Sequence, residues 1–303
     1  MSKVVPVFDH SHLPNASRMP AWIRQPLGQD TRYAHTARAI KTATLHTVCE
    51  EARCPNRGEC WSAGTATFML LGDTCTRACG FCAVKTGKPD WHDPQEPQRI
   101  AAAVAQMGLE YVVLTSVNRD DLADGGADIY AVTIEALRRQ SPHIGLELLT
   151  PDFHRCQNRA LDSICQRLGA VHSTRREVQL VWGHNIETVP SLYRTVRKGA
   201  DYRRSLTLLE QAARRPGIEA KSALMLGLGE TEAEVLMVLR DLRIAGVQRL
   251  SLGQYLRPSR YHLPVLRYLA PAEFDAYADA AHDMGFSWVK AGPMVRSSYH
   301  AHE

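Results

Sequence analysis

Six short apolar runs recur along the chain from residue 65 onward, and their hydrophobic residues follow one another without alternating with polar ones. Runs of this kind are typical of strands that are buried on both faces of a parallel sheet. We therefore expect six buried strands. The runs occupy residues 65–71, 111–115, 145–149, 179–182, 223–226 and 249–252.

Amphipathic stretches separate these runs and predict one helix after each of them. In the stretch at 232–244 apolar residues recur at helical spacing, and Thr231 with Glu234 forms a capping box at its start. A regular succession of strand and helix predicts parallel βαβ units. The six stretches are 97–107, 128–139, 154–168, 203–214, 232–244 and 272–284.

Six such units predict an α/β fold, a partial (β/α)6 barrel of the TIM type. In these barrels the chemistry lies at the carboxyl ends of the strands, and here the loops after the strands carry the polar residues. A doubly wound open sheet is the competing architecture, but no GxGxxG follows the first run, which counts against dinucleotide binding. The first 45 residues contain several prolines and little periodicity, which predicts an extended arm on the core.

The composition and charge of the chain exclude some classes of function. The chain has 303 residues, 45% of them hydrophobic, and 36 basic against 32 acidic side chains. A net charge of +4 without a dense basic block gives no argument for nucleic acid. No run of 18 apolar residues predicts a transmembrane helix, and the first residues lack the order of a secretory signal. We expect a cytoplasmic protein, with a plastid stroma after import as the alternative.

The cysteines carry the candidate chemistry. Six of the eight lie between positions 49 and 82, and in a reducing compartment such a cluster indicates metal binding or catalysis rather than disulfides. Cys156 and Cys165 are nine residues apart on one predicted helix and therefore lie on opposite faces, so we interpret them as ordinary thiols.

Three cysteines, Cys75, Cys79 and Cys82, follow the first predicted strand in a C-x3-C-x2-C loop. A structural zinc site usually has four ligands in two pairs, whereas three thiolates on a four-iron cube leave one iron open. The loop resembles that of the radical S-adenosylmethionine (SAM) superfamily, where the open iron binds the methionine portion of SAM. By the same resemblance Phe81 lies near the adenine. A structural zinc knuckle is the alternative.

A second triplet, Cys49-x4-Cys54-x5-Cys60, precedes the first strand. By itself it fits a zinc site completed by His46. The pairing of both triplets resembles the lipoyl synthase family, and further blocks of residues 40–303 are similar to that family. One departure is Gly183, where the family usually has Asn; another is the unfamiliar stretch at 167–179. The similar blocks are 115–122, 149–152, 184–189, 224–230, 253–256 and 296–299.

The resemblance implies two [4Fe-4S] clusters and SAM as cofactors, and a radical SAM barrel with extensions at both ends. Cys75, Cys79 and Cys82 would hold the cluster that generates the radical. Cys49, Cys54 and Cys60 would hold an auxiliary cluster that donates sulfur. Ser298 would be its fourth ligand, with the neighbouring Ser297 as the alternative. The implied segments are 1–62 with the auxiliary cysteines, 63–285 as the barrel, and 286–303 with the Arg-Ser-Ser-Tyr motif.

The implied reaction inserts two sulfur atoms, at carbons six and eight, into a protein-bound octanoyl-lysine. The implied partners are octanoylated lipoyl-carrier domains (E2 subunits of 2-oxoacid dehydrogenases and the glycine cleavage H protein), an electron donor such as ferredoxin or flavodoxin, and a cluster-repair carrier, with no nucleic acid and no membrane. One rival is a methylthiotransferase acting on tRNA, which would carry an RNA-binding domain and a basic patch. A zinc-binding module without enzymatic activity is the other.

Several residues at strand ends have two interpretations each. Glu147 lies inside an apolar strand and must meet a cation or donor, so it either contacts SAM or forms a structural ion pair. Asn185 and Glu187 follow the fourth strand and face a ligand or fix a loop. Gly227 and Gly229 follow the fifth strand and either let the backbone approach the cofactor or form a plain turn. Less specific candidates are His184, Arg257 as a substrate contact, and Asp120, Asp121 and Asp124, for which capping and turn formation is favoured over a metal site.

Overall fold

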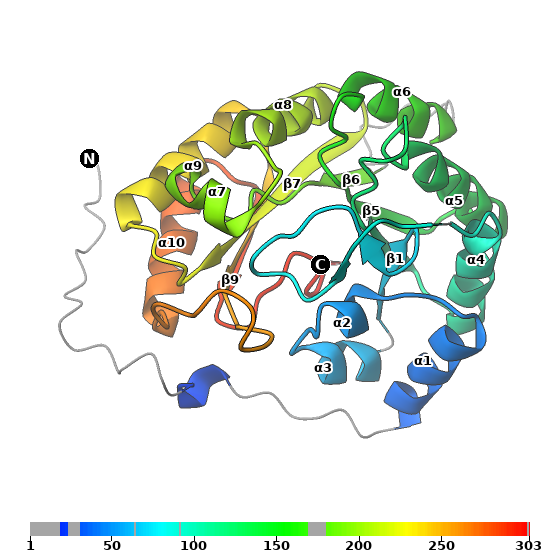
Figure 1. Cartoon of the computed structure of the whole chain (residues 1–303), viewed down its shortest axis with the longest axis horizontal. Helices are drawn as coiled ribbons and strands as arrows, with labels where there is room; N and C mark the ends of the chain where they lie inside the picture. Colours follow the sequence, from blue (N-terminus) through cyan, green and yellow to red (C-terminus); the bar gives the residue numbers. More distant parts are fainter. Residues whose placement is uncertain (1–18, 24–30, 64, 91, 169–179, 302) are drawn as a thin grey trace.

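The computed structural model describes residues 19–23, 31–63, 65–90, 92–168, 180–301 and 303. Seven parallel strands form one curved sheet in the order β1-β4-β5-β6-β7-β8-β9 (Figure 1). Each strand pairs with the next in parallel register, for example Leu70 with Ser116. The strands are β1 (Thr67–Leu70), β4 (Tyr111–Ser116), β5 (Gly145–Leu149), β6 (Leu180–Gly183), β7 (Ile218–Leu226), β8 (Arg249–Gln254) and β9 (Trp288–Gly292).

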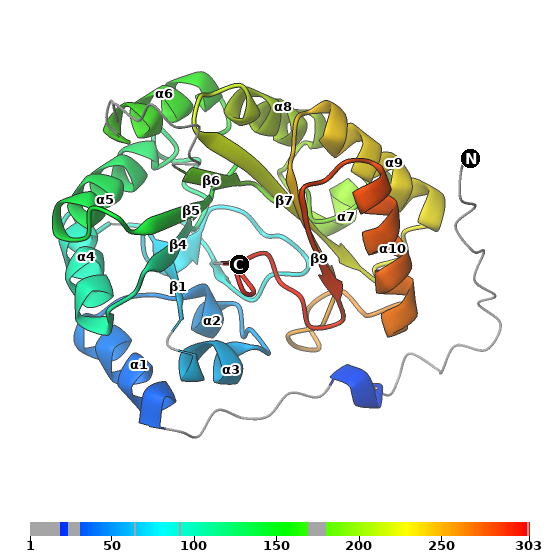
Figure 2. The ribbon, with the colours of Figure 1, turned by 180° about the vertical axis from the view of Figure 1, so that it is seen from behind.

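Helices cover the convex face of the sheet in both views of the ribbon (Figures 1 and 2). The capping box at Thr231 and Glu234 is confirmed, and the face of α9 that carries Val235, Val238 and Leu239 is fully buried. The covering helices are α4 (Glu96–Met107), α5 (Ala127–Gln140), α6 (Gln157–Arg167), α8 (Tyr202–Ala213), α9 (Glu232–Ile244) and α10 (Pro271–Asp283). The predicted α/β barrel-type fold is therefore confirmed.

The sheet contains a seventh strand, β9, that the hydrophobic pattern did not predict. Its sequence, Trp-Val-Lys-Ala-Gly, is only half-buried throughout, so it gives no apolar run. It pairs with β8 from Arg249↔Trp288 to Gly253↔Gly292. Of the predicted fourth strand, residue 179 lies outside the described residues.

The expectation of an extended arm up to residue 45 is wrong for its last part. Residues 31–42 form helix α1 (Thr31–Thr42), because Thr36, Ala39 and Ile40 recur at helical spacing and are buried against the neighbouring helices. Residues 1–18 and 24–30 of the expected arm lie outside the described residues; between them η2 (Ala21–Ile23) is a short 3-10 helix. The prolines in this part of the chain obscured the helical pattern that follows them.

The sheet does not close, and its open side between β1 and β9 holds segments from both ends of the chain. The short helices α2 (Val48–Glu51) and α3 (Arg57–Ser62) lie there beside the final residues (Figures 1 and 2). An antiparallel bridge between Thr47 and Phe68 attaches α2 to the edge of β1. Within the described part of the chain, no helix has the length and apolar character needed to cross a membrane.

Candidate functional site

The first cysteine loop begins where β1 ends and packs against the loop after β4. Cys75 belongs to the two-residue strand β2 (Thr74–Cys75), which pairs with β3 (Lys85–Thr86). The Cys75 Sγ accepts hydrogen bonds from the amides of Arg77 at 3.4 Å and Asn118 at 3.3 Å. The strand ends therefore hold this thiol at the carboxyl edge of the sheet, as the sequence predicts.

Arg77, inside this loop, is the centre of a buried charged network. Its guanidinium donates two hydrogen bonds to Asp152 at 2.7 and 2.8 Å and two to Asp120 at 2.8 Å. Asp152 has no exposed surface and also accepts from Arg204 Nε at 2.8 Å. These bonds hold the pKa of Asp152 well below its usual range, although burial opposes the shift. The Arg77 side chain thus links the loops after β4 and β5 to the cysteine loop.

The second triplet lies on α2 and α3, at the open side of the sheet. Cys49 is buried in α2, Cys60 is half-buried in α3, and Cys54 lies between the two helices. Burial, followed by the neighbouring thiols, raises the pKa of Cys60 to about 12. His46, the candidate fourth ligand of a zinc site, lies with its Nδ1 3.1 Å from Glu51 Oε1.

The end of the chain docks on this second triplet through hydrogen bonds that span most of the sequence. The Asn56 side chain donates to the Met294 carbonyl at 2.6 Å. Thr67, on β1, donates to the Ser298 Oγ at 2.9 Å. Tyr299 donates to Glu59 Oε1 at 2.8 Å. The Arg-Ser-Ser-Tyr segment is therefore fixed beside the three thiols.

Two half-buried charges lie between the two triplets. Arg296 and Glu187 are both half-buried, and Cys54 and Glu187 both act on the charge of Arg296. Glu187 also acts on the thiols of Cys79 and Cys82. The backbone of Glu187 has a positive φ of 67°, which directs the loop after β6 inward. Arg296 and Glu187 thus connect the two cysteine groups electrostatically.

Sequence relatives place this chain in a known family. Residues 69–242 match the Radical SAM superfamily. A lipoyl synthase of Coxiella burnetii is 50% identical over 99% of this chain and 92% of its own length, and one of Methylococcus capsulatus is 52% identical over 94% and 85%. The chain belongs to the lipoyl synthase family. Its candidate site residues are therefore those of a lipoyl synthase family member.

Solved structures support the fold alone, because their sequences are distant. The SuiB–SuiA complex of Streptococcus suis aligns with a TM-score of 0.54 at 14% identity, over 74% of this chain and 48% of SuiB. Methylornithine synthase (PylB) aligns with a TM-score of 0.52 at 11% identity, over 86% of this chain and 78% of its own. The barrel of this lipoyl synthase family member thus has the architecture of these proteins.

The chemistry of the donor sets fits the iron–sulfur clusters of lipoyl synthases. Burial raises the pKa of Cys49 and Cys79 to about 11, and burial above all raises the pKa of Cys82 to about 12. A thiol in such surroundings stays protonated unless a bound cation stabilises the thiolate. Among the described residues no three His, Cys, Asp or Glu side chains are arranged to hold one metal ion. A cubane binds each thiolate on a different iron, so its ligands need not converge on one atom.

Glu147 lies in the structural ion pair, one of its two predicted interpretations. Lys221 Nζ donates to both carboxylate oxygens at 2.9 Å, and the Tyr111 hydroxyl donates at 3.1 Å. Tyr111 is the first residue of β4, and Lys221 pairs in register with Arg249, the first residue of β8. The pair therefore lies toward the amino ends of the strands, whereas the cysteine loop lies at the carboxyl ends.

The other predicted residues are at the carboxyl ends. Asn185 donates to Glu187 Oε1 at 3.1 Å. Phe81 packs on an apolar cluster formed by Val196, Leu228 and Tyr255. The remaining two predicted residues, Gly227 and Gly229, have backbone conformations that suit a plain turn and close packing.

Gly227 and Gly229 have positive φ values of 99° and 112°. A Cβ at Gly227 would lie 2.3 Å from the Arg267 carbonyl oxygen, and one at Gly229 would lie 2.9 Å from Leu266 Cδ1. Both positions therefore require glycine because of this chain's own neighbouring loop. Asp124 caps the start of α5, as its turn interpretation predicts, by accepting from the amides of Gly126 and Asp128.

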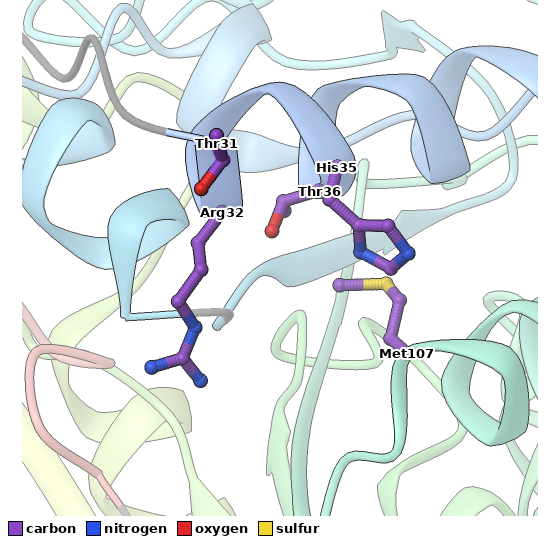
Figure 3. A pocket seen from close by; sticks show the side chains of 5 residues that line it. All are labelled: Thr31, Arg32, His35, Thr36 and Met107. Carbon is purple, nitrogen blue, oxygen red and sulfur yellow. The ribbon is translucent and has the colours of Figure 1, made fainter.

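Two clefts lie outside the cysteine groups. One, at the end of β1, is lined by His46, Asp73, Thr74, Asp93 and Glu96 among others, and thus adjoins Cys75 in the chain. The other lies between α1 and the end of α4 and is lined by Thr31, Arg32, His35, Thr36 and Met107 (Figure 3). No cysteine lines either cleft.

The charged residues that organise this candidate site are not apparent from the sequence. Four such residues make the bonds described above or line the same interior: Arg77, Asp152, Arg204 and Arg197. The sequence gives no signal that pairs them. Arg197 donates to the Asn185 carbonyl and the Tyr193 hydroxyl, both at 2.8 Å. A conserved position would have been visible only in an alignment of relatives.

Proposed function

We propose that this chain inserts two sulfur atoms, at carbons six and eight, into an octanoyl group carried on a lysine of a lipoyl-carrier domain. The observation that carries the proposal is the docking of the Arg296–Tyr299 segment on the second cysteine triplet, beside the first. An alkyl C–H bond offers no acidic proton, so a side-chain base cannot open it. Radical chemistry must come from a cofactor, and the protein binds, orients and shields.

Cys75, Cys79 and Cys82 are proposed to hold the cluster that binds SAM. When bound there, cluster and SAM together supply a primary carbon radical that abstracts hydrogen from the substrate, and two insertions require two SAM molecules. The chain itself provides an apolar wall at Phe81 for the adenine. Asn185 and Glu187 provide polar groups for the rest of SAM, and the buried surroundings exclude water from the radical.

Cys49, Cys54, Cys60 and Ser298 are proposed to hold a second [4Fe-4S] cluster that serves as the sulfur donor. Serine oxygen is a harder ligand than thiolate and binds iron with less covalency, which suits an iron that must leave when sulfur is withdrawn. Thr67 donates to the Ser298 Oγ, and a donated hydrogen bond favours the deprotonated oxygen that a ligand requires. Ser298 is therefore preferred to Ser297.

The proposed partners follow from this reaction. They are octanoylated carrier domains (2-oxoacid dehydrogenase E2 subunits and the glycine cleavage H protein), an electron donor such as ferredoxin or flavodoxin, and a carrier that rebuilds the spent cluster. We propose a cytoplasmic location with neither nucleic acid nor membrane as partner. Strand β9 joins the last segment to the barrel sheet. We therefore propose the division into 1–62, 63–285 and 286–303 as a division by function and not by structural unit.

Anaerobic purification followed by metal and sulfide analysis tests the proposal directly. Two clusters correspond to about eight iron and about eight sulfide per chain. The loaded protein should then convert an octanoyl-lysine peptide to the lipoyl product with dithionite and SAM. About one colourless zinc per chain, or a methylthiolated tRNA as the product, would refute it.

A further inference from the structure

Two neighbouring segments at the carboxyl edge of the barrel expose basic side chains. We call Arg194, Lys198, Arg257 and Arg260 the basic rim; all four are exposed. The first two lie on or after α7 (Tyr193–Val196), and the others lie in the loop after β8. Arg257 donates to the carbonyls of His262 and Arg260, and Arg260 lies over the ring of Tyr261, which is 81% exposed.

The basic rim carries uncompensated charge. Among the described residues, no carboxylate forms an ion pair with any of its four side chains. Two acids near the α7 segment are engaged at helix starts. Asp201 accepts from the amide of Arg204 at the start of α8, and Glu234 belongs to the capping box of α9. Their charge is therefore partly offset by the helix ends.

The rim segments are in direct contact with the first cysteine loop. The Gly80 amide donates to the Val196 carbonyl at 2.9 Å, and the Gly80 carbonyl accepts from the Leu263 amide at 3.0 Å. His262 Nε2 lies 3.0 Å from the Cys82 carbonyl oxygen. A Cβ on Gly80 would lie 2.9 Å from Leu263 Cδ1, so the three segments fit closely. His262, in the same loop as Arg257 and Arg260, thus links that loop to the backbone of Cys82.

We infer that the basic rim is the docking surface for a small, negatively charged one-electron carrier protein. The inference rests on the proposed function, since each cleavage of SAM consumes one electron. The carrier would be oxidised by one electron, and a cluster held by Cys75, Cys79 and Cys82 would supply that electron for cleavage of the sulfonium C–S bond, which yields methionine and a carbon radical. Docking at the rim shortens the path of this electron. Transient redox pairs use small, charge-guided interfaces of this kind.

Charge reversal of the rim tests this surface. The rim variant Lys198→Glu with Arg260→Glu is compared with Lys41→Glu with Arg240→Glu, which changes the net charge equally at exposed positions on α1 and α9. Reduced flavodoxin is the protein donor and dithionite the small-molecule donor. We expect the rim variant to lose about tenfold or more in flavodoxin-driven 5′-deoxyadenosine formation at low donor concentration, and less than about twofold with dithionite. The control variant should match the wild type with both donors.

Binding of oxidised flavodoxin to the cluster-loaded chain gives a second readout that needs no turnover. The wild-type affinity should fall with added salt, and the rim variant should bind about tenfold or more weakly. Unchanged flavodoxin binding in the rim variant would overturn the inference. So would an equal loss with both donors, or a selective rise in KM for the octanoylated carrier with dithionite. Failure of the wild type to cleave SAM with dithionite would count against the proposed function, while the binding titration would still decide the docking surface.

Discussion

The two cysteine triplets are held by different kinds of contact. The loop at Cys75–Cys82 is fixed by ionised side chains, with Arg77 clamped between Asp120 and Asp152. The triplet at Cys49–Cys60 is fixed by single hydrogen bonds from the end of the chain, 231 to 240 residues away in sequence, and of these three only the bond from Tyr299 to Glu59 involves a carboxylate. Charge-assisted bonds are roughly twice as strong as neutral ones, and the buried Arg77 makes four of them. The first site is therefore built rigidly into the barrel, and the second is closed by a separable segment.

Removing each triplet in turn gives the largest expected contrast. Replacing Cys75, Cys79 and Cys82 by Ala should reduce 5′-deoxyadenosine formation to background, since no ligands remain for the SAM-binding cluster. Replacing Cys49, Cys54 and Cys60 should leave that cleavage and remove lipoyl product. Both are measured by chromatography after incubation with SAM, dithionite and an octanoyl-lysine peptide. Lipoyl product from the second variant would contradict the sulfur-donor assignment.

Ser298→Ala should separate the role of the Arg296–Tyr299 segment, which closes the second site, from the role of the barrel. We expect loss of lipoyl product with SAM cleavage retained, because the first cluster keeps its three thiolates. Ser297→Ala is the matched control and should form product normally. Mass spectrometry of the peptide product measures both. An unchanged yield from Ser298→Ala would move the fourth ligand to another residue.

Breaking the clamp on the first loop should destabilise the fold itself. Asp152→Ala leaves the guanidiniums of Arg77 and Arg204 without their buried partner, and losing one partner of a buried ion pair costs about 3–5 kcal/mol. The control Asp162→Ala removes an exposed partner of Arg215 and should cost less than about 1 kcal/mol. Urea unfolding of the cluster-free chain measures both. Equal losses would show that the clamp is no stronger than a surface pair.

His184 makes the first region sensitive to acid. Its Nδ1 donates to the Thr150 carbonyl at 2.8 Å, and its Nε2 lies 3.0 Å from the Ser205 Oγ, which accepts from Tyr193 and Arg197. Burial, followed by the charge of Arg197, lowers its pKa from 6.5 to about 4. The unfolded chain therefore binds a proton first as the pH falls, and stability is lost between pH 6.5 and about 4.

The loss from this one residue should be on the order of 3 kcal/mol. His184→Gln should be less stable at neutral pH and should show a flatter dependence over the same interval. Unfolding in urea at a series of pH values measures the slope. An identical slope in both proteins would mean that other groups cause the acid sensitivity.

The barrel could be predicted from the sequence because burial on both faces leaves continuous apolar runs, as at 145–149. Strand β9 could not, since its half-buried residues give no such run. Helix α1 escaped prediction because prolines precede it and only a narrow face of it is buried. In the site, local spacing revealed the cysteines, whereas Arg77 and Asp152 are 75 residues apart and no periodicity links them. The assignment of Ser298 as a cluster ligand rests on family resemblance alone.

The contacts of the closing segment also set an order of events during synthesis. The Arg77–Asp152 clamp needs only 75 further residues, whereas the Thr67–Ser298 bond needs 231. At about 5–20 residues per second, the second interval is roughly 12 to 46 s. During that time the thiols of Cys49, Cys54 and Cys60 lack their cover on a nascent chain. Protection of these thiols from oxygen must therefore come from outside the chain until its final residues have been translated.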